Sequence, residues 1–265
     1  MKNRNHSYLY LSKILREHEQ SDIWTQDVPF ITGMKFMAPE IVAILQADKL
    51  RTYNLSGGMI NSLPISRSVD SNSQIACLND STIAVTIPSD NLIEIVTVMA
   101  LTTKTDLGTP AGTIMTGGIT CRMDILCVAF TDAIRLMDLS GQIQRVINIP
   151  SVKILHSVNN DKLLCVYSKC DSDKTMSCLD ITNDSLHDFE RFPFHPKDVT
   201  IDDVGNIIFI EDGVIWQSDS DGKNFKIIMT PNYCHWYKHL TYNKRSKTLL
   251  TVNWIDNVEV YKKLE

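Results

Sequence analysis

Two histidines four residues apart, His235 and His239, form the pattern in this sequence that comes closest to a metal site. Such a pair can bind one zinc ion when both side chains lie on one face of a helix. Zinc peptidases carry a glutamate directly after the first histidine, whereas this sequence has Trp236 there. On a strand the two rings would lie about 13 Å apart, at about 3.3 Å per residue, which is too far to share an ion. We therefore expect structural histidines, with no bound metal and no other cofactor.

The other motifs that could support catalysis are incomplete. The glycine-bearing stretch 108–113 lacks the lysine of a phosphate-binding loop, and no Gly-x-Ser-x-Gly motif provides a serine nucleophile. The seven cysteines include no Cys-x-x-Cys pair, which argues for free thiols in a reducing compartment. We therefore predict that the chain is not an enzyme and that it is cytoplasmic.

The composition is that of a protein with a packed core. Of the 265 residues, 43% are hydrophobic and 22% are charged, and no apolar run is long enough to cross a membrane. The formal net charge is -5, so the chain has no overall positive field to attract a polyanion. We therefore expect no membrane partner, and the charge argues against nucleic acid without excluding a local basic patch.

An aspartate followed closely by aliphatic residues recurs along the whole chain. Successive copies lie 39 to 44 residues apart, at Asp48, Asp90, Asp132, Asp173, Asp212 and Asp256. Segments 48–57 and 132–141 also share Asp, Arg, Leu, Ser and Gly at a constant offset of 84 residues, which is two repeats of 42. A fixed period of this length predicts a repeat architecture.

Each repeat contains four short apolar or alternating segments. One precedes the aspartate, as Thr82–Ile87 does, and another follows it, as Leu92–Val98 does. A third comes before this pair, for example Ile75–Leu78, and a fourth comes after it, for example Gln144–Ile149. Four strands in about 40 residues, repeated around an axis, are typical of a β-propeller blade. The six repeats therefore predict an all-β, six-bladed propeller.

The last repeat ends too early to form its own outer strand, because only four residues follow Tyr261. We predict that residues 23–28 supply this strand and close the ring, since closure removes two exposed sheet edges. The propeller would then span residues 23–265, after an N-terminal extension at 1–22. Helical spacing of Tyr8, Leu11 and Leu15 indicates a short amphipathic helix there, or the end of a longer helical region.

The fifth repeat carries a recognisable pattern in segment 195–210. This segment resembles the NHL repeat, with Pro196 at the entry of its first strand and Gly205-Asn206 at the tight turn before an aliphatic run. It departs from that repeat at Asp198, where a small glycine is usual, and it lacks the Asn-Arg pair after the second strand.

Segments 81–88, 134–139 and 249–254 are similar to divergent propellers at the C-termini of invertebrate tripartite-motif (TRIM) proteins. That resemblance implies the recognition module of a ubiquitin-ligase scaffold, which binds protein or RNA. Nothing in the sequence resembles the RING or B-box zinc domains of those proteins, so we expect no ligase activity from this chain itself.

In a propeller, the loops between blades and the loops between the second and third strands share one face. Nine basic or aromatic residues are expected there: Arg67, Arg191, Phe194, His195, Lys197, Tyr233, His235, Trp236 and Tyr237. Such side chains can anchor a peptide or stack on bases, although half of them would serve equally well as packing between blades.

The absence of catalytic motifs favours a non-catalytic module that binds a protein partner through this face. RNA binding by the same face is the first alternative. The second is a calcium-dependent hydrolase of the six-bladed lactonase or arylesterase type, for which the sequence offers no convincing set of converging carboxylates. The six repeated aspartates could form such a ring, but turn residues that bond their own backbone explain them equally well. No small-molecule substrate is indicated.

Overall fold

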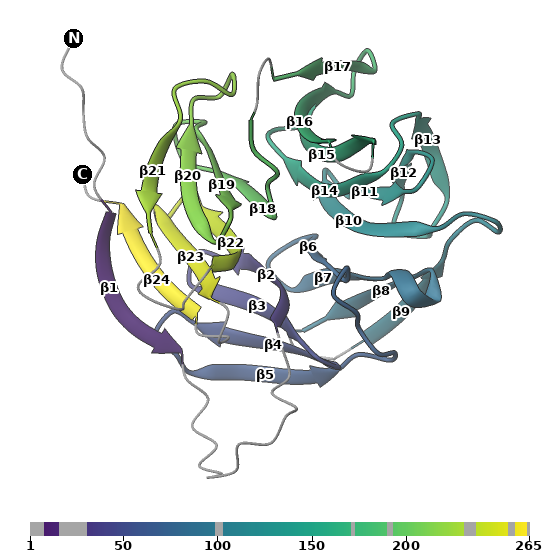
Figure 1. The fold of residues 1–265 in the computed structure, drawn as a ribbon. Coiled ribbons are helices and arrows are strands. Elements are labelled where there is room, and N and C mark those ends of the chain that lie inside the picture. The colour runs from purple at the N-terminus through teal and green to yellow at the C-terminus, as the bar shows by residue number, and fades with distance from the viewer. Residues whose placement is uncertain are drawn as a thin grey trace.

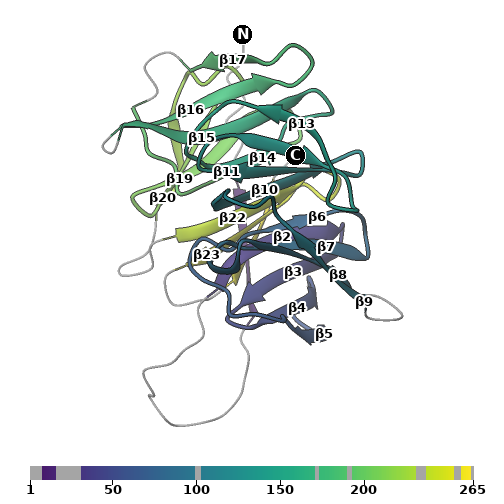
Figure 2. The same cartoon turned by 90° about the vertical axis from the view of Figure 1, so that its right-hand side faces the viewer.

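The computed structural model describes residues 8–15, 31–98, 103–170, 173–189, 193–230, 237–253 and 258–263. Within these ranges 24 strands form six four-stranded antiparallel sheets, arranged as blades around one axis (Figures 1 and 2). The predicted six-bladed β-propeller is therefore confirmed. Among the described residues, no helix is long and apolar enough to span a membrane.

The blades follow one another along the chain, and each begins with its innermost strand. Blade 1 contains β2 (Ile31–Ala38), β3 (Ile41–Gln46), β4 (Lys49–Asn54) and β5 (Met59–Pro64). Blade 2 contains β6 (Ile75–Cys77), β7 (Thr82–Ile87), β8 (Leu92–Thr97) and β9 (Thr103–Gly108), with a short 3-10 helix η1 (Pro88–Asp90) before β8. Blade 3 contains β10 (Met115–Arg122), β11 (Ile125–Phe130), β12 (Ile134–Met137) and β13 (Ile143–Ile147).

The second half of the chain repeats this order. Blade 4 contains β14 (Val152–Ser157), β15 (Lys162–Cys170), β16 (Asp173–Asp180) and β17 (Ser185–Asp188). Blade 5 contains β18 (Asp198–Ile201), β19 (Ile207–Glu211), β20 (Val214–Ser218) and β21 (Lys226–Met229). Blade 6 contains β22 (Tyr237–Asn243), β23 (Thr248–Asn253), β24 (Val258–Lys263) and, as its outer strand, β1 (Tyr8–Leu15).

Among the described residues the core consists of six apolar clusters, one between each pair of neighbouring blades. Between blades 2 and 3, for example, Ile93 packs with Met115 and Phe130, all of them buried. The second strands read as continuous apolar runs, such as Ile-Leu-Cys-Val-Ala-Phe in β11, because both of their faces lie against a neighbouring blade. Strands buried in this way can be recognised from the sequence alone.

The N-terminal segment differs from the prediction. Tyr8–Leu15 form strand β1, antiparallel to β24, so the helix expected there is wrong for these residues. The closing strand thus precedes the expected one, and residues 23–28 lie outside the described residues. Tyr-Leu-Tyr-Leu at the start of β1 is rich in strand formers, and the free edge of β24 offers a ladder of backbone hydrogen bonds. This tertiary pairing overrides the helical spacing.

Candidate functional site at the mouth of the central channel

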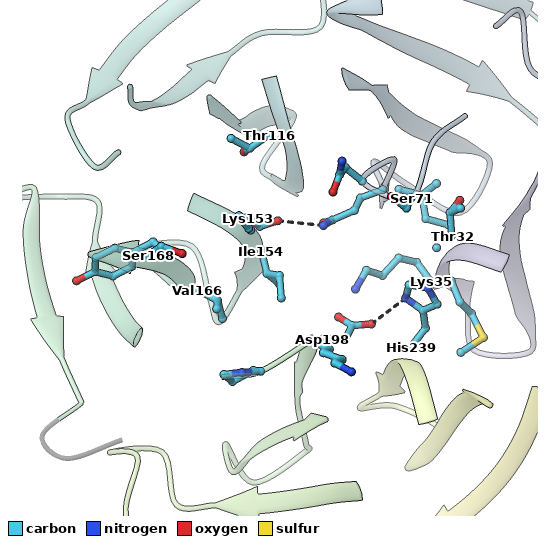
Figure 3. A pocket seen from close by; sticks show the side chains of 18 residues that line it. Thr32, Lys35, Ser71, Thr116, Lys153, Ile154, Val166, Ser168, Asp198 and His239 are labelled. Atoms are coloured by element: carbon cyan, nitrogen blue, oxygen red, sulfur yellow. Dashed lines mark hydrogen bonds and ion pairs between the residues drawn. The ribbon is translucent and has the colours of Figure 1, made fainter. Parts of the chain in front are cut away.

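A cavity of about 210 Å³ lies on the propeller axis, where the six inner strands meet. Every blade contributes to its lining, as Figure 3 shows. The contributions, in blade order, are Lys35, Gln74, Thr116, Lys153, Asp198 and His239. No single repeat could build this site, because each supplies only one wall of it.

The cavity lies near the starts of the inner strands. Thr116 and Lys153 are second residues of β10 and β14, and Asp198 is the first residue of β18. Ser168, near the end of β15, lies on the same wall. These positions face the loops between blades and the loops between second and third strands, which we call the loop face. We call the opposite side, with the turns between first and second strands, the turn face. The cavity is therefore on the face predicted for binding.

Asp198 is held by three donors. Its Oδ1 accepts the backbone N–H of Val199 at 2.8 Å, its Oδ2 accepts that of Leu240 at 3.0 Å, and His239 Nδ1 lies 3.6 Å from Oδ2. Burial alone would raise the pKa of Asp198, but the bond from His239, the positive charge of Lys35 and the Leu240 N–H together lower it. The carboxylate is therefore charged at neutral pH, with its oxygens already engaged.

The lysines of the cavity differ from Asp198, because their charged groups are not bonded within the described part of the chain. Lys35, Lys153 and Lys197 line it, and among the described residues none of their ammonium groups makes an ion pair or a hydrogen bond. Lys35 is half-buried and extends across the cavity toward Asp198 (Figure 3). Lys153 and Lys197 are exposed. The lining thus carries three lysine charges against one aspartate charge, within a chain of net charge -5.

The charges of the cavity also affect the pKa of His156. Burial lowers its pKa to about 3, the positive charges of Lys35 and Lys244 act in the same direction, and Asp198 opposes them. This ring keeps part of its surface open, yet it is uncharged at neutral pH. His156 therefore adds no charge to the channel, and its protonation would add to the positive potential already there.

Two adjacent glycines in β10 let the neighbouring blades approach the cavity. Gly117 has a φ of +103°, and a Cβ on it would lie 1.9 Å from the backbone oxygen of Asn72 in blade 2. A Cβ on Gly118 would lie 3.0 Å from the backbone oxygen of Lys153 in blade 4. Because these two residues of β10 have no side chain, Gln74 Nε2 can donate to the same Lys153 oxygen, at 3.0 Å. The glycines thus set how closely the walls of blades 2 and 4 come together.

Three of the nine predicted residues lie exposed on the loop face. Lys197 lines the cavity. Arg67 lies 3.6 Å from Asp90, so it links the loop before blade 2 to η1 within that blade. The backbone N–H of His195 donates to Glu211 Oε2 at 2.9 Å, and burial raises the pKa of Glu211. Four further candidates lie outside the described residues: Arg191, Tyr233, His235 and Trp236.

The remaining two predicted residues pack against other side chains of the protein, and Phe194 is half-buried. The ring of Phe194 lies 4.7 Å from Trp216, 5.0 Å from Phe225 and 5.2 Å from Phe209, between ring centroids. This contact anchors the incoming loop to blade 5, so Phe194 has the packing role that the sequence left open as the alternative.

Tyr237 is 6% exposed, and it lies in the core and not on the surface. Its hydroxyl is 3.1 Å from that of Tyr261, which in turn donates to Glu259. Asn253 Nδ2 donates to the other oxygen of Glu259 at 3.2 Å. Burial raises the pKa of Tyr261, and the bond to Glu259 adds to the effect. Tyr237 therefore belongs to a buried polar network of blade 6.

Of the residues that line the cavity, sequence reasoning predicted only Lys197 and missed the other ionisable ones, namely Lys35, Lys153, Asp198 and His239. Two of these residues stand out in the sequence. Asp198 departs from the small residue usual in the NHL pattern, and His239 belongs to the histidine pair read as structural. For Lys153 and Asp198 a further signal is a charged residue at the first or second position of an inner strand, because the starts of the inner strands line the axis.

The repeated aspartates do not mark a metal site among the described residues. No group of three or more His, Cys, Asp or Glu side chains there could hold a metal ion. Asp132 instead pairs with Arg135 through two hydrogen bonds of 2.8 Å each, and these lower the pKa of Asp132. The backbone N–H groups of Asp132 itself and of Ala133 also bond its carboxylate and lower its pKa, as expected for a turn residue. On the turn face, Asp202 holds its turn in a similar way, because its Oδ1 accepts the N–H groups of Val204 and Asn206.

Neither a protein-family model nor a curated protein sequence matches the chain. Solved propellers do resemble it in fold. The WD40 domain of Neurospora crassa Pan2 superposes with a TM-score of 0.58 at 14% identity, over 85% of this chain and 73% of that one. The β-propeller domain of Cps50 (Swd1) from Myceliophteria thermophila gives 0.63 at 11% identity, over 88% and 82%.

The WD40 propeller of Doa1 also gives a TM-score of 0.63, at 9% identity and over 98% of both chains. At these identities the likeness shows the fold alone. The chain is therefore a six-bladed β-propeller with WD40 propellers among its structural neighbours, and the NHL and tripartite-motif resemblance stays a prediction.

Proposed function

We propose that this propeller is a non-catalytic recognition module that binds a protein partner through its loop face, over the mouth of the central channel. One observation carries the proposal. All six blades converge on a cavity lined by three lysines, whose ammonium groups make no ion pair or hydrogen bond with the described residues. Ammonium groups without such a bond in the free protein are available for a ligand. Propellers of the WD40 type typically act as scaffolds for protein interaction, which agrees with this role.

The size of the cavity favours a peptide side chain over a metabolite. Sites for drug-sized molecules usually occupy about 300–1,000 Å³, and this cavity has about 210 Å³. Exposed side chains on the surrounding loops, such as Arg67 and His195, would extend the contact beyond the cavity. A partner would thus place one side chain in the channel and rest on the loops around it.

The proposal can be tested by selecting binding peptides from a displayed random library on the whole chain. Selected peptides should lose binding to a variant with R67E and K197E on the loop face. A variant with K162E and R245E, both on exposed turn-face residues, is the matched control and should bind as the wild type does. Peptides that lose binding only to the turn-face variant would place recognition on the other side of the disc and refute the proposal.

RNA binding by the same face is favoured by one observation, the three cavity lysines. Phosphate neutralisation makes such binding strongly dependent on salt. Retention of a random RNA pool on a filter at about 50 mM salt, lost on raising the salt and lost in the R67E/K197E variant, would support RNA over protein. A tripartite-motif context for the module is a further proposal, which rests on the sequence resemblance.

A further inference from the structure

We propose that the channel mouth is an anion site, built from Lys35, Lys153 and Lys197, that takes a carboxylate or phosphate group of an acidic peptide. This inference rests on the proposed recognition function and specifies the chemistry of the group recognised. It starts from the charges of the cavity, in which three lysines face one aspartate.

Asp198 offsets only one of the three lysine charges, so the lining keeps a net positive charge. Asp198 already accepts two backbone N–H groups at 2.8 and 3.0 Å, and His239 lies beside its second oxygen. Among the described residues no carboxylate lies within ion-pair distance of Lys35, Lys153 or Lys197. Lys35 acts on Asp198 from beyond ion-pair distance, and its half-buried ammonium group gains more from an anion than an exposed one does, because solvent screens it less.

The neutral groups on the lining also favour an anion. Ser71 and Ser168 bring hydroxyl groups that make no other hydrogen bond among the described residues. The backbone oxygen of Lys153 on the lining accepts from Gln74, and that of Gly117, beside the cavity, accepts from Thr86. The two hydroxyl groups thus add hydrogen-bond donors to the three ammonium groups, which suits a group that accepts hydrogen bonds.

The architecture keeps this charge arrangement in place. Lys35, Lys153 and Lys197 come from blades 1, 4 and 5, so the lysines surround the cavity from different sides and cannot move together. Asp198 fixes His239 and Leu240 of blade 6 against blade 5 and so closes the wall between those blades. Asp198 has a positioning role here, while the lysines would touch the anion.

The test uses the whole chain and three fluorescent peptides that differ at one central residue, which is glutamine, glutamate or phosphoserine. We expect the glutamate and phosphoserine peptides to bind at low salt and the glutamine peptide to bind at least tenfold more weakly, since each hydrogen bond to a charged group contributes about a tenfold factor or more. Comparison of the two acidic peptides distinguishes a carboxylate from a phosphate, and titration with inorganic phosphate should displace whichever binds.

Variants then locate the site. K153Q and K197Q change exposed side chains and should fold normally, and together with K35M they should abolish discrimination against the glutamine peptide. K162Q, an equal charge change on the turn face, is the control and should retain it. Equal affinity for all three peptides, or discrimination that survives K153Q/K197Q but not K162Q, would overturn the inference. Selected peptides that bind the loop face without any acidic residue would overturn it while leaving the proposed function intact.

Discussion

Gly117 provides the most sensitive test of how the blades meet at the axis. Its φ of +103° is a backbone conformation that residues with a side chain rarely adopt, and a Cβ there would lie 1.9 Å from the backbone oxygen of Asn72. Replacement by alanine therefore has two costs, one from the backbone conformation and one from the displaced loop of blade 2. Alanine at Gly205 would have only the conformational cost, because Gly205 has a φ of +92° and no atom within 4 Å of an added Cβ.

The expected magnitudes follow from these two terms. Holding a residue other than glycine in such a conformation costs about 1–3 kcal/mol, and this term applies to both G117A and G205A. Forcing extra volume into a packed site costs about 1–3 kcal/mol more, and this term applies only to G117A. We therefore expect G117A to lower the free energy of unfolding by about 1–3 kcal/mol more than G205A does, a difference of about 5 °C in melting temperature.

Urea unfolding followed by tryptophan fluorescence, together with thermal melting, measures this difference. G108A is a third variant, with an ordinary φ and no atom within 4 Å of its added Cβ, and it should stay within about 0.5 kcal/mol of the wild type. G117A should also weaken binding of an acidic peptide, since the displaced loop carries Ser71 and Asn72 of the cavity. Equal destabilisation by G117A and G205A would show that the loop of blade 2 does not approach β10 as described.

Three other predictions follow from the structure. Deletion of residues 1–15 removes β1 and exposes the edge of β24, so it should lower the melting temperature and promote aggregation, whereas deletion of residues 1–7 should do neither. F194A should destabilise the protein by about 3–5 kcal/mol by emptying the aromatic cluster of blade 5, as urea unfolding would show, and R67A should change stability by less than about 0.5 kcal/mol. Because the folded-state pKa of His156 is about 3 and the ordinary value is 6.5, the unfolded chain binds a proton that the folded chain does not between these values. Stability should therefore fall with pH from about 6.5 downward, by at most about 1.4 kcal/mol per pH unit, and H156Q should flatten this slope when urea unfolding is measured between about pH 6.5 and 4.5. An unchanged slope in H156Q would place the titrating group elsewhere.

The blades could be predicted from the sequence because their signal is local. Strands such as β7 and β11 are apolar on both faces and end at a turn, so the run of residues itself marks the strand. The period of about 42 residues then gave the number of blades. Strand β1 carried no such signal, because its conformation depends on the edge of β24, more than 240 residues away along the chain.

The candidate site could be predicted only in part, for a related reason. The sequence indicated the face on which the cavity lies and one of its residues, Lys197, but the cavity takes its ionisable residues from blades 1, 4, 5 and 6 at positions without a shared spacing. The aromatic residues were predicted to bind a partner because large aromatic side chains are common in binding sites, yet Phe194 and Tyr237 pack against other side chains. Lysines near the start of an inner strand look like ordinary surface residues until the ring closes and brings them around one axis.

The central claim is that a ligand binds where the six blades meet. Hydrogen–deuterium exchange with and without a selected peptide tests it most directly. The peptide should slow exchange together in segments 71–75, 116–118, 153–154 and 196–198, which come from four blades and share only the channel mouth. Protection confined to the turn face, or to outer strands such as β5, β13 and β21, would contradict it.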